Sequence, residues 1–485
     1  MLKSNKLVNK TPRMTILSED DKEQIYDASL EILQHTGVKI DLEEARDIFA
    51  DAGARVDGDM VHIPPCLVNE AVKKAPKKIL MYDRNGELAM RLGGKNSYFG
   101  SGTDVPRTLD ENGEMRQTNA EDIAKWARLC DGLDNIDFSS PIGLLRKQPE
   151  NIQDLLEARQ VMANTTKPVM FCSWDDRGTK DIFDMAAIAV GGEEQLKAKP
   201  YIVHYIEPVT PLSHSKEVAA QVIFGAKNNL PTIYTPMPSA GAVSPMTLAG
   251  SIALGLAESL TGITLAQLVQ EGAPMVTGGI YSILDMKTSG FVYGGPEFGL
   301  MNAAVTEMAQ YLGLPMFGTA GVTDSKVVDT QAAIEATFNI VTQSLAGANL
   351  VHDVGYLSSG LLYSYDQLTI SDEIIGMTKR IMKGIDTSKE NLATDLVQEV
   401  GPKGNFLSTS HTMDNFKKEH WQPTLMDRHN FEAWEKEGSK TMGERIHEKS
   451  TKILETHEPE ALDEDKQEEL DAIIEEEKEN REVRY

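Results

Sequence analysis

The sequence predicts an α/β protein built on a (β/α)8 TIM barrel. Short apolar segments recur along the chain, the later ones end in glycine-rich turns, and a helical segment separates each from the next. Strands separated by helices of this size cannot pair as hairpins, so they need crossover connections and form a parallel sheet. Eight such units in a row favour a closed barrel over an open sheet.

The eight expected strands lie within the middle of the 485-residue chain. They cover residues 98–102, 136–142, 168–173, 201–207, 232–236, 274–278, 315–319 and 350–354. No GxGxxG motif follows an early strand, and no GxxxxGK[ST] motif is present, so neither a dinucleotide fold nor a P-loop is indicated.

Helix-start signals stand between the expected strands. Thr118 and Glu121 have the spacing of a capping box, Pro245 and Pro296 suit a first helical turn, and Asp329 can cap the alanine-rich segment behind it. These signals predict one helix after each strand.

Residues 1–95 are expected to form an N-terminal α+β cap. Helical spacing covers residues 20–36 and 42–52, and Pro64-Pro65 begins a third helix. Asp57-Gly58 and Asn85-Gly86 stand between strand-like segments and predict two hairpins, because both residues of such a pair tolerate positive φ. A similar pair, Asn112-Gly113, predicts a hairpin over the barrel mouth.

The barrel itself is assigned to residues 96–386, with its eighth helix at 369–385. Residues 387–485 are expected to form a helical C-terminal extension that ends in an acidic tail. The tail from Glu455 to Tyr485 has 14 acidic and 4 basic residues, and we expect it to be solvated.

Net charge limits the partners. With 48 basic and 74 acidic residues, the formal charge is −26, which disfavours nucleic acid and anionic membranes and favours cationic partners. No run of about 18 apolar residues is evident and the N-terminal segment lacks an apolar signal core, so we expect a cytoplasmic protein. Three dispersed cysteines, Cys66, Cys130 and Cys172, indicate neither a disulfide framework nor a CxxC metal site.

The active site of a barrel lies at the C-terminal ends of its strands, and aromatic residues occur at nearly all of these ends here. The candidate substrate-binding rings are Tyr98, Phe99, Trp174, Tyr205, Tyr234, Tyr281, Phe317 and Tyr356. Carboxylates accompany most of them, and a desolvated quaternary ammonium gains about 2 kcal/mol or more per good ring contact. The pattern favours a cationic, methylated amine, although any single ring can simply fill the barrel.

Three residues at strand ends are the candidate catalytic residues: His352, Glu207 and Asp104. His352 is either a general acid/base or a hydrogen-bond donor to a carboxylate or amine; alternatively, Asp353 or the backbone satisfies it. Glu207 either serves the site or pairs with a loop cation, since an unpaired buried carboxylate is costly. No metal is expected, because three clustered ligands are needed; Cys172, His204 and Glu207 are a weak alternative set.

Five long stretches of the chain carry a family resemblance. They are TIYTPMPSAGAVSPMTLAGSIALGLAESL, YGGPEFGLMNAA, GTAGVTDSKVVDTQAA, LAGANLVHDVGYLSSGLLYSYDQLTISDEI and HTMDNFKKEHWQPTLMDR. Together they resemble the trimethylamine methyltransferase superfamily over residues 15–435 or so. Some members of that family carry pyrrolysine; this chain has only standard residues and resembles the non-pyrrolysine branch, with the loop at Val322 taken as the equivalent position.

The resemblance implies a methyltransferase that moves a methyl group from a quaternary amine to the Co(I) of a separate corrinoid protein. Glycine betaine is the favoured substrate, with proline betaine and carnitine as alternatives. Arg107 and Lys326 are candidates for holding a betaine carboxylate, and both can equally be surface charges. A corrinoid domain usually shows DxHxxG; Asp427-Arg428-His429 lacks the glycine, so no cofactor is expected to be bound permanently.

Two other functions remain open from the sequence. One is a barrel lyase or aldolase in which Lys326 forms a Schiff base, and the other is a betaine-binding protein without chemistry. We also expect a homo-oligomer.

Overall fold

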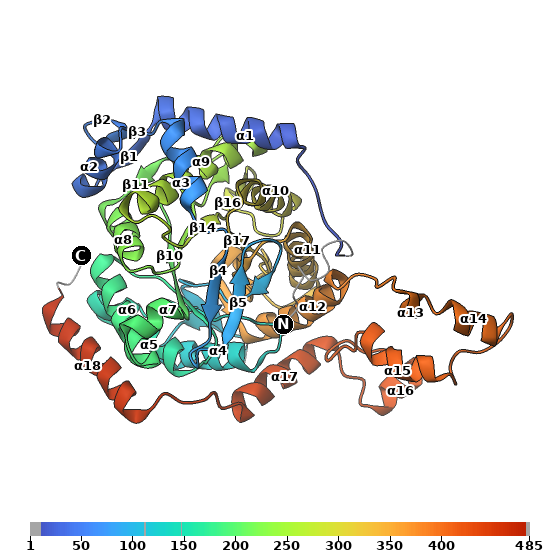
Figure 1. The fold of residues 1–485 in the computed structure, drawn as a ribbon. Helices are drawn as coiled ribbons and strands as arrows, with labels where there is room; N and C mark the ends of the chain where they lie inside the picture. The colour runs from blue at the N-terminus through green and yellow to red at the C-terminus, as the bar shows by residue number, and fades with distance from the viewer. Residues whose placement is uncertain (1–10, 111–112, 147, 482–485) are drawn as a thin grey trace.

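The centre of the protein is a ring of parallel strands (Figure 1). The computed structural model describes residues 11–110, 113–146 and 148–481. Seven strands pair in the spatial order β6-β18-β17-β14-β12-β10-β9. Their bounds are β6 Tyr98–Phe99, β9 Val169–Phe171, β10 Ile202–Ile206, β12 Thr232–Tyr234, β14 Met275–Gly278, β17 Met316–Thr319 and β18 Leu350–His352.

The eighth strand position closes this ring. Single parallel bridges join Gly100 to Phe138 and Ser139 to Val169, so residues near 138–139 lie between β6 and β9. This segment falls within the second expected strand, but its pairing is reduced to two bridges. The eight-unit barrel predicted from the sequence is confirmed.

A helix follows each strand position and covers the outside of the ring (Figure 1). These are α4 Ala120–Gly132, α5 Gln153–Ala163, α6 Asp176–Val190, α8 Lys216–Lys227, α9 Leu248–Val269, α10 Pro296–Leu312, α11 Thr330–Ala346 and α12 Tyr365–Met382. The short 3-10 helix η3, Glu150–Ile152, directly precedes α5. The short helix α7, Glu193–Ala198, follows α6.

Two of the predicted helix starts are displaced. The capping box of α4 is formed by Asn119 and Asp122, one residue later than predicted, because the Asn119 side chain accepts from the Asp122 backbone. Helix α9 begins at Leu248, so Pro245 lies before its first turn. Pro296 and the Asp329 cap are found where they were predicted.

Helix α9 is the most apolar helix of the barrel. By length and composition it could cross a membrane, but 83% of its apolar window is buried within the protein. It packs against α8 and against α1 and α3 of the N-terminal region. Glu258 and several hydroxyl residues interrupt its apolar residues, so the sequence does not show a continuous apolar run of that length.

The N-terminal region packs on α9 and α8. It contains α1 Glu19–Glu31, the π-helix η2 Ile32–Thr36, β1 Val38–Ile40, α2 Glu43–Asp51, β2 Arg55–Asp57, β3 Met60–His62 and α3 Pro65–Lys74. β2 and β3 form the hairpin predicted at Gly58. Strand β1 pairs with β3 and also with β11, Ser213–His214, from a barrel loop, so one small sheet joins the cap to the barrel.

The second predicted hairpin closes one end of the barrel. β4, Ile79–Tyr82, and β5, Leu88–Leu92, pair antiparallel around the Asn85-Gly86 turn. Their inner side chains, Met81 and Met90 among them, join the core formed by the strands' inward residues. Figure 1 shows the hairpin in front of the ring. The site therefore lies at the opposite end, where the parallel strands end.

Two small sheets surround that opposite end. They are built from the loops after the barrel strands. Their strands lie in the spatial orders β19-β20-β7-β8 and β13-β15-β16. Their bounds are β7 Arg107–Leu109, β8 Met115–Gln117, β13 Ser239–Ala240, β15 Ser282–Asp285, β16 Gly290–Phe291, β19 Tyr356–Leu357 and β20 Leu362–Ser364, with the 3-10 turn η4 at Ser358–Gly360. β7 and β8 pair as the hairpin predicted over the mouth; residues 111–112 of its turn lie outside the described residues.

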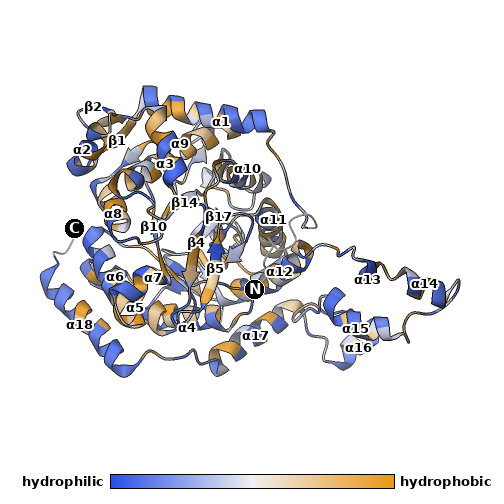
Figure 2. Ribbon diagram, viewed as in Figure 1, coloured by the Kyte–Doolittle hydropathy of each residue, from blue (hydrophilic) through white to orange (hydrophobic). Residues whose placement is uncertain are grey.

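The C-terminal extension has two parts (Figure 1). An arm projects beside α12 and carries mostly polar residues with scattered apolar ones (Figure 2). It comprises α13 Lys389–Leu392, α14 Thr394–Val400, α15 Ser410–Glu419 and α16 Phe431–Lys436. The chain then returns along the barrel as α17, Met442–Thr456, against α12 and α4, and α18, Glu464–Asn480, against α6 and α5.

The acidic tail is therefore not simply solvated. Leu470, Ile474 and Glu477 of α18 are buried against the barrel. The expectation of a solvated tail is wrong for this helix, because an apolar stripe and a terminal arginine fix one face of it.

Candidate active site

Carboxylates from four parts of the barrel converge at the open end. Asp104 follows β6, Glu207 follows β10 and Asp353 follows β18; Glu157 comes from helix α5. The charge of Asp104 acts on each of the other three and raises their pKa values. All three catalytic candidates, His352, Glu207 and Asp104, belong to this end of the barrel.

Asp353 lies at the centre of the hydrogen bonding. Its Oδ1 is 3.1 Å from Nε2 of His352, and its Oδ2 accepts from the Tyr293 hydroxyl at 3.3 Å. Burial raises the pKa of Asp353 well above its usual value, and the charges of Glu207 and Asp104 raise it further. Asp353 is thus protonated over much of the range in which an exposed aspartate is charged.

Gly102 allows this arrangement by having no side chain. A Cβ there would collide with Oδ1 of Asp353 and with the Tyr356 hydroxyl. The Tyr356 hydroxyl donates to the carbonyl of Thr103, so the turn after β6 lies directly against the end of β18. This close approach explains a glycine at that position.

Glu207 is paired with a phenol rather than with a cation. The Tyr205 hydroxyl donates to Glu207 Oε2 at 3.0 Å. Burial raises the pKa of Glu207 to about 7, and the Tyr205 hydrogen bond offsets only part of that rise. Near neutral pH Glu207 is consequently partly protonated, and binding of a cationic ligand would favour its ionised form.

Asp104 and Glu157 complete the acidic wall. Asp104 has a left-handed backbone with φ of 63° and an exposed side chain, yet surrounding protein raises its pKa by desolvation. Burial raises the pKa of Glu157 to about 8, and this side chain accepts from the Leu145 backbone at 2.8 Å.

No basic side chain balances these four acids. In the parts of the chain that the structure describes, no lysine or arginine nitrogen lies within 4.0 Å of their carboxylate oxygens. Two like unit charges about 5 Å apart repel by about 3 kcal/mol at an effective dielectric constant of about 20. The group that this arrangement lacks is a cation. Among the described residues, no three acids, histidines or cysteines are grouped closely enough to hold a metal ion.

His352 is held neutral in this setting. Burial lowers its pKa to about 3. Its Nδ1 lies 3.1 Å from the Gly318 carbonyl, which assigns the ring proton to Nδ1 and leaves Nε2 as an acceptor. Protonated Asp353 then donates to Nε2, so the pair carries no net charge. His352 consequently serves as a hydrogen-bonding partner of Asp353 rather than as a free acid.

Three rings cluster inside the barrel at this level, tilted relative to one another. His352 lies 4.1 Å from Phe317 and 5.9 Å from Tyr205, and those two rings are 5.4 Å apart, centroid to centroid. With Tyr356 and Tyr293 beside Asp353, they bring aromatic faces next to the carboxylates. Of the eight candidate rings, Tyr205, Phe317 and Tyr356 join this group.

Four other candidate rings lie elsewhere, which corrects their expected place at the mouth. Tyr98 points into the barrel at its closed end, where its hydroxyl accepts from the Arg91 backbone of β5 at 3.1 Å. Phe99 faces the helices. Tyr234 and Tyr281 pack against glycines of α9, and Tyr234 also bonds to His214. Alternation along a strand sends neighbours to opposite faces, and these strands are too short to show which face is inside.

Trp174 and the two proposed cations lie on the surface. Trp174 is 48% exposed after β9. Arg107 is exposed on β7 with its guanidinium against Met115, and Lys326 is exposed with its Nζ on the Asp324 carbonyl at 2.7 Å. The proposal that Arg107 or Lys326 holds a substrate carboxylate therefore has no support in these side-chain positions.

Several residues of the site were not selected from the sequence. Asp353, Tyr293 and Cys172 follow strands and could have been chosen on that ground. Cys172 lies beside Asp104, and burial raises the pKa of its thiol well above the usual value. Glu157 lies mid-helix on α5, and nothing in the sequence distinguishes it from a surface glutamate. Val322, assigned to the pyrrolysine position, is buried with its carbonyl bonded to Asn339.

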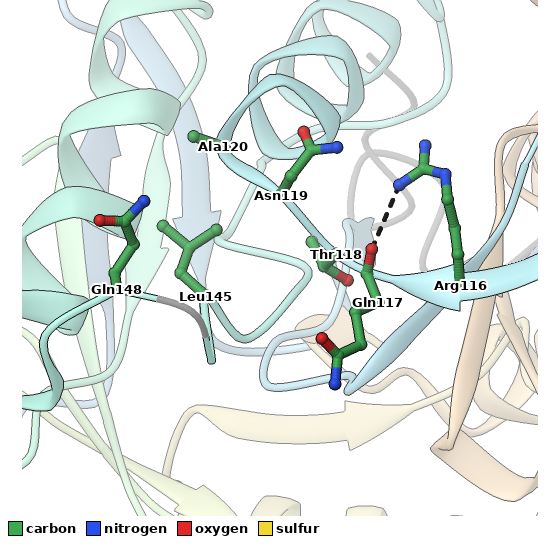
Figure 3. Close-up of a pocket in the computed structure, with 7 residues that line it drawn as sticks. All are labelled: Arg116, Gln117, Thr118, Asn119, Ala120, Leu145 and Gln148. Atoms are coloured by element: carbon green, nitrogen blue, oxygen red, sulfur yellow. Dashed lines mark hydrogen bonds between the residues drawn. The ribbon is translucent and has the colours of Figure 1, made fainter.

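A hollow of about 400 Å³ lies next to Leu145, whose backbone bonds to Glu157. It is lined by Arg116, Gln117, Thr118, Asn119, Ala120, Leu145 and Gln148 (Figure 3). Arg116 is already engaged with both oxygens of Asp122 at 2.6 and 2.7 Å, and Asn119 caps α4, so the remaining polar side chains here are mainly the amides of Gln117 and Gln148.

Known proteins of one family are similar to this chain over nearly its whole length. A family model described as trimethylamine methyltransferase (MTTB) matches residues 1–482. Trimethylamine methyltransferase MttB of Desulfitobacterium hafniense (strain DSM 10664 / DCB-2) is 35% identical over 465 residues, covering 95% of this chain and 93% of the relative. Glycine betaine methyltransferase of Desulfitobacterium hafniense (strain Y51) is 32% identical over 468 residues, covering 96% and 97%.

Among solved structures, the monomethylamine methyltransferase MtmB of Methanosarcina barkeri has a similar fold. Its TM-score is 0.53 at 13% sequence identity, with 91% of this chain and 88% of that chain covered. This likeness concerns the barrel fold, and the family assignment depends on the sequence matches. The chain belongs to the trimethylamine methyltransferase family and is an enzyme of the methyltransferase class.

Proposed function

We propose that this enzyme transfers a methyl group from a quaternary ammonium compound to the Co(I) of a separate corrinoid protein. The observation that carries the proposal is the set of buried carboxylates without a basic partner, next to aromatic rings at the open end of the barrel. A quaternary nitrogen supplies the positive charge that the acids lack, and its methyl groups suit aromatic faces.

The proposed methyl transfer requires no general acid or base from the protein. The C–N electron pair stays on nitrogen, so the product leaves as a neutral tertiary amine and no side chain has to donate a proton to it. Co(I) supplies the electron pair for the new bond, which is chemistry that the partner brings. The residues of this chain bind the cation, orient one methyl group outward and exclude water.

The neutral state of His352 is consistent with that division of labour. A histidine with its pKa lowered to about 3 adds no positive charge that would repel the substrate. In this proposal Glu207 and Asp104 act by charge, and the His352–Asp353 pair acts by shape and hydrogen bonding.

The hollow next to Leu145 supports a docking role for a corrinoid-bearing partner. Amide side chains of Gln117, Asn119 and Gln148 line this hollow (Figure 3). Amides form reciprocal hydrogen bonds with the carboxamide groups that a corrinoid ring carries. Glycine betaine is the substrate that the sequence resemblance favours, and proline betaine and carnitine are the alternatives; all three also carry a carboxylate.

The lyase or aldolase alternative has a specific observation against it. Schiff-base formation needs a lysine whose amine is desolvated in an apolar pocket, whereas Lys326 is exposed and bonded to a backbone carbonyl. A binding protein without chemistry differs from the proposal only in turnover, so a kinetic test separates the two.

The test mixes the full-length enzyme with a corrinoid protein reduced to Co(I) and a panel of quaternary amines, including glycine betaine, carnitine and choline. The expected result is a change in the corrinoid absorption spectrum together with stoichiometric tertiary amine. Glu271→Gln, at an exposed ion pair with Lys74, is the matched control for charge removal and should retain full activity, whereas Glu207→Gln should lose most of it. Binding without any tertiary amine from any member of the panel would contradict the proposal.

A further inference from the structure

We infer that the preferred substrate is a methylated ammonium whose remaining part carries no anionic group, so that neutral-tailed cations are used in preference to betaines. The inference rests on the proposed function of the same site and specifies its substrate class. The observations that carry it are the arrangement of charges and the engagement of hydrogen-bond donors around the open end of the barrel.

A betaine brings both of its charges into the site. In glycine betaine one methylene separates the ammonium from the carboxylate, so a bound ammonium places the carboxylate among the same groups. Those groups include Asp104, Glu157 and Glu207, and the charge of Asp104 already acts on both glutamates. A substrate carboxylate there adds a further negative charge to an acidic wall.

Three candidate cations for relieving this repulsion are engaged or directed elsewhere. Arg107 lies exposed against Met115, Lys326 is bonded to the Asp324 carbonyl, and Arg116 is held by both oxygens of Asp122. In the described part of the chain, the ion pairs of Arg159, Lys379 and Arg481 likewise lead to acids outside this site.

Several backbone donors near the open end are also engaged by protein carboxylates. Tyr293 and Gly294 donate their N–H groups to the two oxygens of Asp324, each at 2.9 Å. The N–H of Asp324 donates to Glu335 at 2.8 Å, and that of Leu145 donates to Glu157 at 2.8 Å. Protein carboxylates therefore occupy these four backbone donors.

A neutral tail meets the opposite situation. Carboxylate oxygens are acceptors, so a hydroxyl or amide N–H on the substrate finds partners at Asp104 or Glu207, where a carboxylate finds repulsion. The structure thus favours ligands such as choline, betaine amide or tetramethylammonium.

Betaine amide and glycine betaine form the sharpest pair of probes, because they share a skeleton and differ in tail charge. Calorimetry on the full-length enzyme at pH 8 should show betaine amide and choline binding at least about 30-fold more tightly than glycine betaine. Methyl transfer to the Co(I) corrinoid protein should follow the same order in kcat/KM. Equal or tighter binding of glycine betaine would overturn the inference.

A variant adds an internal test. Glu207→Gln removes one negative charge and should reduce the preference for betaine amide over glycine betaine about tenfold, while Glu271→Gln should leave the ratio unchanged. An unchanged ratio in a folded Glu207→Gln protein would also overturn the inference. Should that variant not fold, the two probes on the unaltered enzyme decide the matter. Failure of every compound to donate a methyl group would instead contradict the proposed function, because the binding order is measured separately.

Discussion

At the scale of single residues, the protein keeps carboxylates in an unfavourable state at the site. Glu207 with a pKa of about 7 and Glu157 with a pKa of about 8 bind protons in the folded protein that they would release when unfolded. Burial is the first cause in both cases. Burying these carboxylates costs free energy that no basic side chain among the residues described offsets. A bound cationic ligand would offset that cost.

Cation binding should consequently depend on pH. A cation prefers the ionised carboxylates, so affinity should rise as pH increases through about 7 and on through about 8, where Glu207 and Glu157 lose their protons. Calorimetry of tetramethylammonium at pH 6, 7 and 8 in two buffers of different ionisation enthalpy measures both the affinity and the protons released. Constant affinity without proton release would show that neither carboxylate faces the ligand.

Glu207→Gln should weaken cation binding and increase the stability of the ligand-free protein. The raised pKa means that stability due to this group is present at low pH and is lost as pH rises through about 7, so at pH 8 its removal should stabilise the ligand-free protein by about 1–3 kcal/mol. Urea unfolding at pH 5 and pH 8 checks the difference, with the gain expected only at pH 8. A loss of stability at both values would indicate that Glu207 is favourably paired.

Gly102→Ala should disrupt the site through a single methyl group. The added Cβ meets Asp353 and Tyr356, whose positions are fixed by the end of β18, so we expect a loss of about 1–3 kcal/mol in stability and weaker cation binding. Gly443→Ala is the control, since a Cβ there meets only Thr441 at 4.0 Å within a helix. Thermal unfolding and calorimetry of both variants measure the contrast.

At the scale of elements, two segments distant in sequence complete the barrel. The β4–β5 hairpin fills its closed end, and α18 covers the outside of α5 and α6. Arg481, just after α18, pairs with Asp154 at 3.2 Å, Asp181 at 2.6 Å and Glu477 at 3.0 Å, and its side chain is 8% exposed. This arginine therefore fixes the helix that carries Glu157.

Arg481→Met should release α18 from the barrel. Removing one partner of a buried ion pair leaves uncompensated carboxylates and costs about 3–5 kcal/mol. Limited proteolysis should then cut near α18 at a protease concentration that spares the unaltered protein. Lys478→Met, which breaks only the exposed pair with Glu475, should change neither stability nor cleavage measurably.

Neighbouring positions in β4 separate the hairpin's two faces. Met81 is fully buried with the barrel core, whereas Leu80 is 39% exposed. Met81→Ala should cost about 2–5 kcal/mol, because it leaves a cavity, and Leu80→Ala should cost less than about 1 kcal/mol. Equal losses in chemical unfolding would mean that the hairpin does not close the barrel.

At the scale of the whole molecule, one barrel organises the N-terminal region, the site and the C-terminal return. Surface acids give the chain its charge of −26, but the charges that define the site are the few acids inside the open end. The arm from α13 to α16 has no buried residue in its helices and carries exposed Leu392, Leu407 and Phe431. Homo-oligomerisation stays a prediction for this molecule.

Local patterns in the sequence determined the eight strand positions, most helix starts, and the hairpins at Gly58 and Gly86. Each depends on residues a few positions apart, and the strand–helix alternation leaves a parallel barrel as the consistent arrangement. The stretches that resemble the methyltransferase family could also be recognised from the sequence. Glu207, Asp104 and His352 could be placed at the open end because they directly follow strands.

Only the tertiary structure decided which side chains face that end. Strands of two to five residues give no pattern from which to assign their inner face, so Tyr98, Phe99, Tyr234 and Tyr281 were misplaced. Glu157 comes to the site from a helix, and Arg481 meets Asp154 across 327 positions of the chain. Contacts of this kind depend on how packed elements approach in space, and no local pattern in the sequence encodes that geometry.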